Sequence, residues 1–340
     1  MYHFRNDYSQ GAHPQVLEAL IATNMEATCG YGEDEYCLEA ARQVKERFAC
    51  ENAAVHFLVG GTQTNYTAIT AFLRPWEAVV AVDTGHIAVH ETGAVEARGH
   101  KVITVPHAEG KLTPKALEEV YREHCTVNIA HMVLPKMVYI SDSTELGTVY
   151  TKAELTALRA CCDKLGMYLY MDGARLASAL TAEGNDLVPE DLPRLCHAFT
   201  LGGTKCGLLF GECLVITEPA LMPNFRYCIK QCGGMLAKGR LLGVQFQALL
   251  REDLWLKLGK KQNTLAVRLS EGFEKAGYRL YAQSPTNQVF PVLPKEKIAF
   301  LEQHATFEFI APVDEGHDAV RFVTSWATEE KDVQGLLELL

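Results

Sequence analysis

The sequence predicts an α/β protein with a mostly parallel sheet in a large domain and a smaller α+β domain at the C-terminus. Short β-rich apolar runs alternate with helical patterns as far as about residue 240. Such alternation produces a parallel sheet with helices on both faces. Beyond residue 240 the alternation stops, and 340 residues exceed what one small domain needs. We therefore expect a large domain over residues 1–240 and a small domain over residues 241–340.

Strands of the large domain are expected where a short apolar run lies between turn residues. Helical patterns cover residues 36–49 and 64–73. A further helix is expected after Thr151, which forms a capping box with Glu154, and Gly166 is placed to end it. The predicted strands are residues 53–59, 78–83, 101–106, 129–134, 167–172, 197–201 and 209–216.

The small domain is expected to combine helices with weaker strands. A long helix-like stretch runs from residue 240 to about residue 276. The remaining predicted elements are strands at 278–281, 287–292 and 319–325, a helix at 295–303 and a last helix from Thr328.

Charge and composition exclude several classes of protein. The net charge of −10, without a basic cluster, argues against nucleic acid or an anionic membrane as a partner. No apolar run approaches the about 18–20 residues that span a bilayer, and the N-terminus lacks the layout of a signal peptide. The eleven cysteines then indicate reduced, buried thiols and a cytoplasmic location. No C-x-x-C or H-E-x-x-H occurs, so no metal site is expected.

Lys205 and Asp172 are the most informative residues of the chain. Lys205 follows a predicted strand among Gly202, Gly203 and Gly207, which would let the backbone pass close to a flat ligand. Asp172 ends another strand, at the edge where parallel sheets bind ligands. Together they predict an amine that forms a Schiff base with an aldehyde cofactor, and a carboxylate that keeps a pyridine nitrogen protonated. Taken singly, a solvated turn lysine and a helix N-cap aspartate are alternative interpretations.

A phosphate site and a ring-contacting histidine are predicted after two other strands. Gly61 and Thr62 follow one strand and open a helix, where backbone N–H groups bind phosphate well. His86 follows the next strand, where an imidazole suits stacking on a ring or proton transfer. A tight strand-to-helix turn and an ordinary packed or surface histidine are the alternatives.

Arg175 and Arg321 are candidate ligands for a carboxylate, because a guanidinium group binds carboxylates through two parallel hydrogen bonds. Arg321 lies in an apolar strand-like run of the small domain. An arginine that faces outward from that strand is equally consistent with the pattern.

The order of these motifs resembles one family. A glycine-threonine turn, a histidine, D-G-A-R at a strand end and a glycine-ringed lysine follow one another as in the low-specificity L-threonine aldolases. These belong to the β-eliminating lyase group of fold-type-I pyridoxal-phosphate enzymes. The opening residues 4–8 (Phe-Arg-Asn-Asp-Tyr), residues 30–34 (Gly-Tyr-Gly-Glu-Asp) and the late Arg-Phe-Val-Thr at 321–324 are similar as well, so the resemblance covers nearly the whole chain.

The resemblance implies a function and a role for each candidate residue. The enzyme would use pyridoxal 5'-phosphate to cleave β-hydroxy-α-amino acids such as L-threonine and L-allo-threonine into glycine and an aldehyde. It would be a homodimer or homotetramer with shared active sites, in which Tyr31 and Lys238 reach a neighbouring subunit's site. Lys205 would carry the cofactor, Asp172 would pair with its ring nitrogen, His86 would stack on the ring, Gly61 and Thr62 would hold its phosphate, and Arg175, Arg321 and Asn6 would hold the substrate carboxylate.

Two departures from the family pattern concern the substrate. Asn6 stands where the family usually has serine. A second histidine, expected near residues 140–145 to contact the β-hydroxyl, is absent from that stretch, so Asp142 or Glu145 becomes the candidate base. Two other functions stay open at this point: another pyridoxal-phosphate reaction, such as β-elimination, decarboxylation or transamination, and a catalytically silent scaffold.

Overall fold

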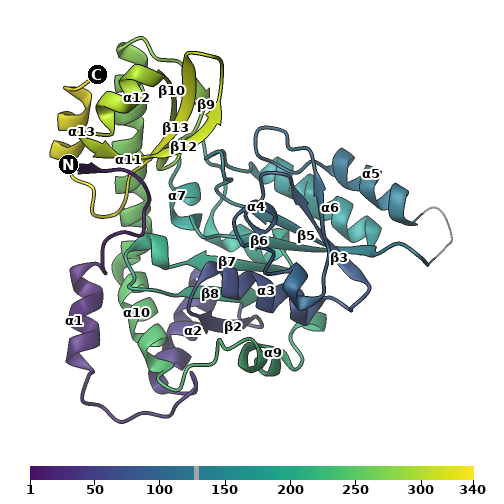
Figure 1. Cartoon of the computed structure of the whole chain (residues 1–340). Helices are drawn as coiled ribbons and strands as arrows, with labels where there is room; N and C mark the ends of the chain where they lie inside the picture. The colour runs from purple at the N-terminus through teal and green to yellow at the C-terminus, as the bar shows by residue number, and fades with distance from the viewer. Residues whose placement is uncertain (126–129) are drawn as a thin grey trace.

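The computed structural model describes residues 1–125 and 130–340, and its centre is a seven-stranded sheet (Figure 1). The two middle strands are the ones expected to carry the key residues: β6 ends at Asp172 and β7 ends shortly before Lys205. Across the sheet the strands are β2 (Ala54–Leu58), β8 (Glu212–Ile216), β7 (Ala198–Gly202), β6 (Tyr168–Asp172), β5 (Leu134–Ser141), β3 (Glu77–Val82) and β4 (Val102–Val105).

Strand direction in this sheet decides where a site forms. The neighbours from β7 to β4 are all parallel, whereas β8 is antiparallel to both β7 and β2. Strand β2 therefore runs in the same direction as β7. As a result, the carboxyl ends of β2, β3, β5, β6 and β7 and the amino end of β8 lie along one edge of the sheet. Ligand sites of open parallel sheets form at this edge.

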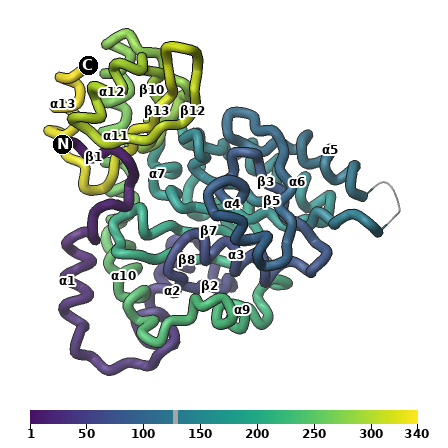
Figure 2. Tube along the Cα trace, viewed as in Figure 1, coloured from purple at the N-terminus to yellow at the C-terminus, as the bar shows by residue number. Residues whose placement is uncertain are grey.

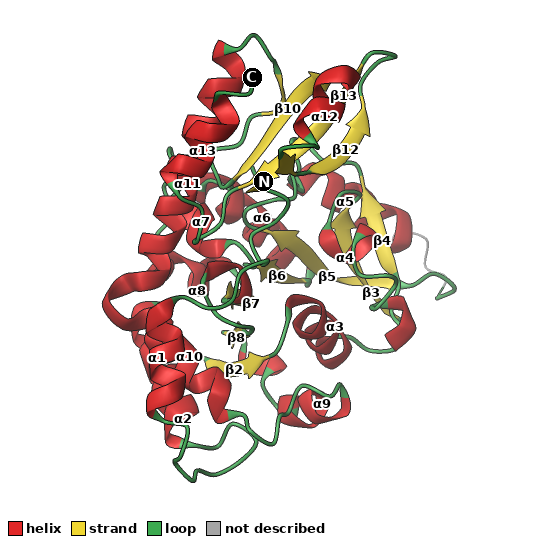
Figure 3. Ribbon diagram, turned by 60° about the vertical axis from the view of Figure 1, so that its left-hand side comes forward, coloured by secondary structure: helices red, strands yellow, loops and turns green. Residues whose placement is uncertain are grey.

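Helices cover both faces of the sheet (Figure 3). The pleat of β3 sends Val80 to one buried cluster and Val79 and Ala81 to the other. One face is covered by α2 (Glu35–Arg47), α5 (Pro114–Cys125), α6 (Lys152–Leu165) and α10 (Arg240–Leu250), and the other by α3 (Gly61–Phe72) and α9 (Phe225–Gln231). The predicted capping box of α6 and its end at Gly166 are confirmed.

The small domain is a four-stranded antiparallel sheet backed by helices. Its strand order is β12 (Glu308–Pro312), β13 (His317–Val323), β10 (Gln288–Pro294) and β9 (Leu280–Ala282). The helices are α11 (Leu254–Lys275), α12 (Lys295–Leu301) and α13 (Glu330–Leu337). The N-terminal strand β1 (Tyr2–His3) pairs with β11 (Ala305–Thr306), so both chain ends lie at this domain (Figure 2).

Buried side chains change cluster partway along α11. Leu254, Trp255 and Leu258 pack in the core of the large domain, whereas Leu265 and Leu269 pack in the small one. The predicted division at residues 240 and 241 falls at the start of α10, and it stays a prediction. The remaining elements are α1 (Pro14–Ala22), α4 (His86–Val89), α7 (Leu176–Leu180), α8 (Leu192–Leu195) and 3₁₀ turns at Glu96–Arg98, Pro189–Asp191, Thr204–Cys206, Pro219–Leu221 and Arg251–Asp253.

Three local expectations differ from the structure. The strand expected at 129–134 begins only at Leu134, and residue 129 lies outside the described residues. The long helical stretch after residue 240 is broken where Glu252 and Asp253 take positive φ values. Strand β12, at the edge of the small sheet, was not predicted. Among the described residues, no helix has the length and apolar character needed to cross a bilayer.

Candidate active site

A cavity of about 740 Å³ lies where the carboxyl edge of the large sheet faces the small domain. Its wall comes from the segments that follow β2, β3, β5, β6 and β7, from the start of β8, and from β10, β12 and β13. Topology therefore brings together residues that are far apart in the sequence. The predicted residues that line the cavity are Gly61, Thr62, His86, Asp172, Arg175, Lys205 and Arg321.

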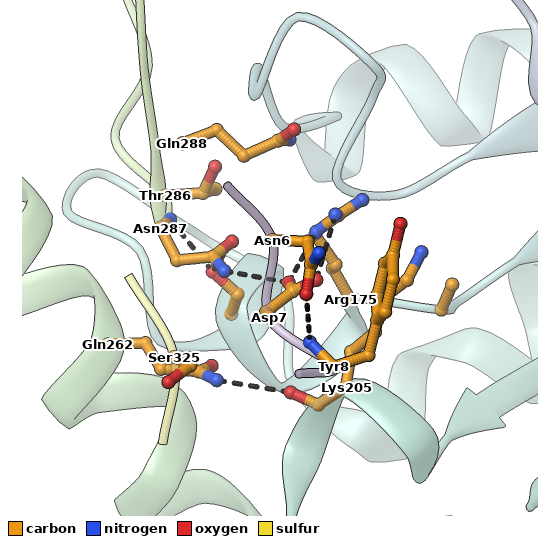
Figure 4. A network of polar contacts seen from close by, with 12 residues as sticks. Asn6, Asp7, Tyr8, Arg175, Lys205, Gln262, Thr286, Asn287, Gln288 and Ser325 are labelled. Atoms are coloured by element: carbon orange, nitrogen blue, oxygen red, sulfur yellow. Dashed lines mark hydrogen bonds and ion pairs between the residues drawn. The ribbon is translucent and has the colours of Figure 1, made fainter. Parts of the chain in front are cut away.

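Lys205 projects from the short turn after β7 into this cavity. Burial lowers the pKa of its ammonium group and the Arg175 cation lowers it further, while Asp7 and Asp172 oppose the shift. A lowered pKa favours the neutral amine, which is the nucleophilic form. The Tyr8 ring lies beside it, with 6.0 Å between the Lys205 Nζ atom and the ring centre (Figure 4).

The glycines before Lys205 serve backbone packing. A Cβ atom on Gly202 would lie 2.4 Å from the Ala174 carbonyl oxygen, and one on Gly203 would lie 2.3 Å from a Leu208 methyl. Neither position tolerates a side chain without displacing its neighbours. The lack of side chains thus brings the turn after β7 against the turn after β6, which sets Lys205 beside Asp172. Their expected role of letting the backbone pass close to a flat ligand stays a prediction.

Asp172 is a buried carboxylate with bonds to both oxygens. Its Oδ2 atom accepts hydrogen bonds from Asn65 Nδ2 (2.8 Å) and the Tyr139 hydroxyl (2.7 Å), and its Oδ1 atom accepts one from the Ala174 N–H (2.9 Å). Burial by itself raises the pKa of Asp172, but His86, these hydrogen bonds and Lys205 together hold it below its usual value. The side chain is therefore ionised at neutral pH. It caps the turn before α7, and α7 itself begins only at Leu176.

His86 is joined to Asp172 through two buried side chains. Its Nδ1 atom lies 2.8 Å from Glu91 Oε1, and Asn65 Nδ2 donates to both Glu91 and Asp172 at 2.8 Å. The backbone N–H of His86 donates to Glu145 Oε1 (2.9 Å). These contacts hold the His86 imidazole at the wall of the cavity, with Glu91 as its ion-pair partner.

The start of α3 offers open backbone donors to an anion. Gly60 is the N-cap and provides no side-chain cap, and Gly60, Gly61 and Thr62 line the cavity. A Cβ atom on Gly60 or Gly61 would meet nothing within 4 Å, so the space above this turn is empty of protein atoms. Among the described residues, the buried hydroxyls of Thr84 and Ser143 at the cavity wall also lack a partner. These features suit a phosphate group.

Both predicted carboxylate-binding arginines already contact a carboxylate of the chain. Arg175 donates from Nε and Nη2 to Asp7 Oδ2 (2.8 Å) and Oδ1 (3.1 Å), and Asn287 also donates to Asp7 (Figure 4). Arg321 pairs with Glu308 and donates to Gln288 Oε1 (3.2 Å).

Three predicted residues lie elsewhere. The Asn6 side chain accepts hydrogen bonds from the Tyr8 N–H (3.0 Å) and the Ser9 hydroxyl (2.8 Å), beside Asp7 rather than in the cavity wall. Tyr31 and Lys238 are exposed and belong to neighbouring segments, since the Tyr31 N–H donates to the Ala237 carbonyl. Neither lines this chain's own cavity.

The two acidic candidates from residues 140–145 are separated by the fold. Glu145 lines the cavity. Asp142 is buried outside it, with its Oδ1 atom 3.4 Å from the Tyr150 N–H, and burial raises its pKa to about 8. Within residues 1–125 and 130–340, no group of histidine, cysteine and carboxylate side chains is arranged to hold a metal ion.

Several residues of the site escaped the sequence reading. Asp7, Asn65, Glu91 and Tyr139 make the contacts that orient Arg175, Asp172 and His86. Asp7 and Asn65 lie within motifs already noticed, so a search for buried polar residues inside those motifs would have found them. Glu91 carries no comparable signal.

Comparisons with known proteins show the family of this chain. Residues 3–296 match the model of the family "Beta-eliminating lyase". A low-specificity L-threonine aldolase from a Pseudomonas species is 31% identical over 98% of this chain and 95% of its own length. The structure of a threonine aldolase from Leishmania major shares 47% identity and a TM-score of 0.97 over 100% of this chain and 98% of that one.

A more distant structure fixes the fold class. Aspartate aminotransferase from Thermus thermophilus aligns with a TM-score of 0.72 at 16% identity, over 100% of this chain and 90% of its own. The predicted fold-type-I architecture is therefore confirmed.

Proposed function

The chain belongs to the beta-eliminating lyase family, and from that membership we propose that it is a pyridoxal-phosphate-dependent aldolase. Its substrates are L-threonine, L-allo-threonine and similar β-hydroxy-α-amino acids, which it splits into glycine and an aldehyde. The names of its relatives support this reaction. The observation that carries the proposal is the meeting of the half-buried Lys205 amine and the ionised Asp172 carboxylate in one cavity.

The residues of the cavity fit the cofactor at each end. When bound, pyridoxal 5'-phosphate supplies an aldehyde for an amine and a ring that withdraws electrons from the substrate's α-carbon. Lys205 would present the amine, and Asp172 would keep a proton on the ring nitrogen. The open donors of Gly61 and Thr62 would hold the phosphate, and His86 would cover the ring.

The substrate is oriented by its carboxylate. Arg321 and Arg175 line the same cavity and supply the positive charge that a carboxylate requires, and Asn6 orders the segment that brings Asp7 to Arg175. A substrate whose carboxylate is held by these arginines would have its Cα–Cβ bond in a fixed orientation within the cavity. Pre-organised positioning of this kind lowers the entropic part of a reaction barrier.

The proposed assembly is a cytoplasmic homodimer or homotetramer. Tyr31 and Lys238 are exposed on adjacent segments outside this chain's cavity, which supports a contact with a second copy. Lys238 then supplies a cation for the neighbour's phosphate. Sedimentation velocity of the purified protein tests the assembly.

A substrate panel tests the reaction. L-threonine, L-allo-threonine, phenylserine, serine and cysteine are supplied to the purified, cofactor-loaded protein. Glycine with acetaldehyde or benzaldehyde is expected from the first three. Pyruvate and ammonia would instead identify β-elimination, and the absence of every product from a coloured protein would contradict the aldolase assignment.

Lys205→Ala tests the covalent role of the lysine. The variant should lose both the near-visible absorbance of the bound cofactor and threonine cleavage, because Lys205 is the only lysine among the described residues that line the cavity. Lys257→Ala, at an exposed position of α11, is the matched control and should keep both. A Lys205→Ala protein that is still labelled covalently after borohydride reduction would disprove the assignment.

A further inference from the structure

We propose that Glu145 is the base that takes the proton from the substrate's β-hydroxyl group. This assignment rests on the proposed function, and it names the one catalytic group that the sequence left open between Asp142 and Glu145. Their positions select between the two. Glu145 lines the cavity, whereas Asp142 is buried outside it with its carboxylate directed at the Tyr150 N–H.

The other carboxylates of the cavity are engaged or remote. Asp172 uses both oxygens in hydrogen bonds, and Glu308 is paired with Arg321. Glu212 lies at the amino end of β8 and is hydrogen-bonded to Thr204, next to the lysine turn. Asp83 is exposed to solvent at the end of β3. Among the cavity-lining acids of the described chain, Glu145 is therefore the one that combines partial burial with a carboxylate oxygen open to a new contact.

Glu145 is held so that one oxygen stays available. Its Oε1 atom accepts hydrogen bonds from the His86 N–H (2.9 Å) and from the Ser141 hydroxyl (2.7 Å). Its Oε2 atom has no side-chain partner among the residues that the structure describes. Two donors on one oxygen fix the plane of the carboxyl group, which is how a positioned base is prepared for a proton at hydrogen-bonding distance.

Glu145 lies near residues that are expected to contact the cofactor and the substrate. It is close enough to His86, Asp172 and Arg175 to interact with their charges. It therefore shares the cavity with the residue expected to cover the cofactor ring and with those expected near the substrate carboxylate. An amino acid bound between Lys205 and the arginines would occupy the cavity that Glu145 lines.

The charges and burial around Glu145 favour its proposed role as a base. Burial raises the pKa of the Glu145 carboxyl group, and the neighbouring Asp172 raises it too, against the lowering effects of Ser141 and His86. A carboxylate whose pKa is raised holds a proton more readily than an ordinary surface glutamate.

The proposed step balances in atoms and electrons. The β-hydroxyl proton moves to Glu145 Oε2, and the electron pair of that O–H bond becomes part of the aldehyde C=O bond. The Cα–Cβ bond breaks, and its electron pair stays with the α-carbon. One proton is taken at oxygen and one is returned at the α-carbon, so glycine and the aldehyde account for the whole substrate.

Glu145→Gln tests the role while keeping the oxygen that His86 and Ser141 bind. L-threonine cleavage should fall by about 10²- to 10⁴-fold, the usual contribution of a general base. Exchange of the glycine α-proton for deuterium, followed by NMR, should stay close to wild type, because it needs the cofactor apparatus but no β-hydroxyl. Asp142→Asn is the matched control and should cleave threonine like wild type.

Two further measurements separate a base from a structural role. The rate of wild-type cleavage should fall as the pH falls through the pKa of Glu145, because a base must be deprotonated, and this acid limb should disappear in the residual activity of Glu145→Gln. In the apo protein, infrared difference spectra between acid and alkaline pH should lose one titrating carboxyl signal in the variant.

The outcomes are distinct. Near-normal threonine cleavage by Glu145→Gln would overturn the assignment and leave His86 or His90 as the acceptor. Loss of both cleavage and glycine exchange would overturn it as well, because it would show that Glu145 only positions His86. A wild-type protein that exchanges glycine but releases no aldehyde from threonine would instead defeat the proposed function itself.

Discussion

Arg175 and Arg321 line the same cavity, yet their surroundings differ. Arg175 forms two hydrogen bonds with Asp7, and the side chains are 12% and 1% exposed. Arg321 pairs with Glu308, whose side chain is 38% exposed on the edge strand β12. Its Nε atom is buried without a partner among the described residues. The first arginine is committed to holding the N-terminal segment, and the second keeps capacity for a ligand.

The pKa values express the same difference. Burial lowers the pKa of Arg175, but the adjacent Asp7 more than offsets this and the net shift is upward. Burial also lowers the pKa of Arg321, the Arg175 cation lowers it further, and the compensation by Glu308 is incomplete. A cation that its own protein compensates incompletely gains more from an incoming carboxylate. We therefore expect Arg321 to dominate substrate binding and Arg175 to dominate stability.

The largest effect should come from Asp7→Asn. Removing the buried charge of this largely buried pair leaves Arg175 without its partner, which typically costs about 3–5 kcal/mol. The midpoint of urea unfolding should fall accordingly. Glu118→Gln, which removes an exposed ion pair with Lys164, should leave the midpoint unchanged. Equal midpoints for the two variants would show that Asp7 does not anchor the N-terminal segment.

The pH dependence of this loss has a definite sign. Burial raises the pKa of Asp7, but Arg175, Lys205 and the hydrogen bonds lower it more, so the folded-state value lies below the unfolded one. The stabilisation is then complete above the unfolded pKa and is lost as the pH falls through the folded pKa. The stability gap between wild type and Asp7→Asn should be full at neutral pH and narrow in acid. A gap that widened in acid would contradict the pairing.

Arg321→Gln should act on binding more than on stability. Truncating one partner of a desolvated charge pair costs about 2 kcal/mol or more, so KM for L-threonine should rise by roughly 30-fold or more. The thermal midpoint should change little, because Glu308 can turn toward solvent. Arg279→Gln, at an exposed site of the small domain, is the control for the loss of a positive charge. An unchanged KM would indicate that Arg175, and not Arg321, binds the substrate carboxylate.

The sequence predicted the site residues that directly end or follow a strand with a recognisable pattern. Asp172 ends β6, Lys205 follows the adjacent parallel strand β7, and Gly61 opens a helix after β2, so strand order alone brings them to one edge. The pairing of Asp7 with Arg175 joins residues 168 positions apart and has no local pattern. Whether an arginine is free or already paired depends on such contacts, and sequence patterns do not contain them.

Two strands, β5 and β12, were misplaced or missed because neighbouring strands override the local sequence preference. Strand β5 contains Pro135 and Lys136, which disfavour a strand, and the more apolar residues before it attracted the prediction. Hydrogen bonding to β3 and β6 on either side stabilises the strand despite these two residues. The edge strand β12 has an apolar run of only three residues, Phe309 to Ala311, which ends at Pro312, a residue that disfavours strands.

The smallest effect should come from Glu308→Gln, and its direction is the sharpest test of the contrast. In the free protein Glu308 occupies the guanidinium that a substrate carboxylate needs. Because a partly exposed ion pair is worth up to about 1 kcal/mol, releasing Arg321 should lower KM for L-threonine by about two- to fivefold. The thermal midpoint should stay near wild type, whereas the corresponding change at Asp7 lowers stability. A higher KM for Glu308→Gln would mean that Glu308 orients Arg321 for the substrate instead of competing with it, and the two arginine pairs would then share one supporting role.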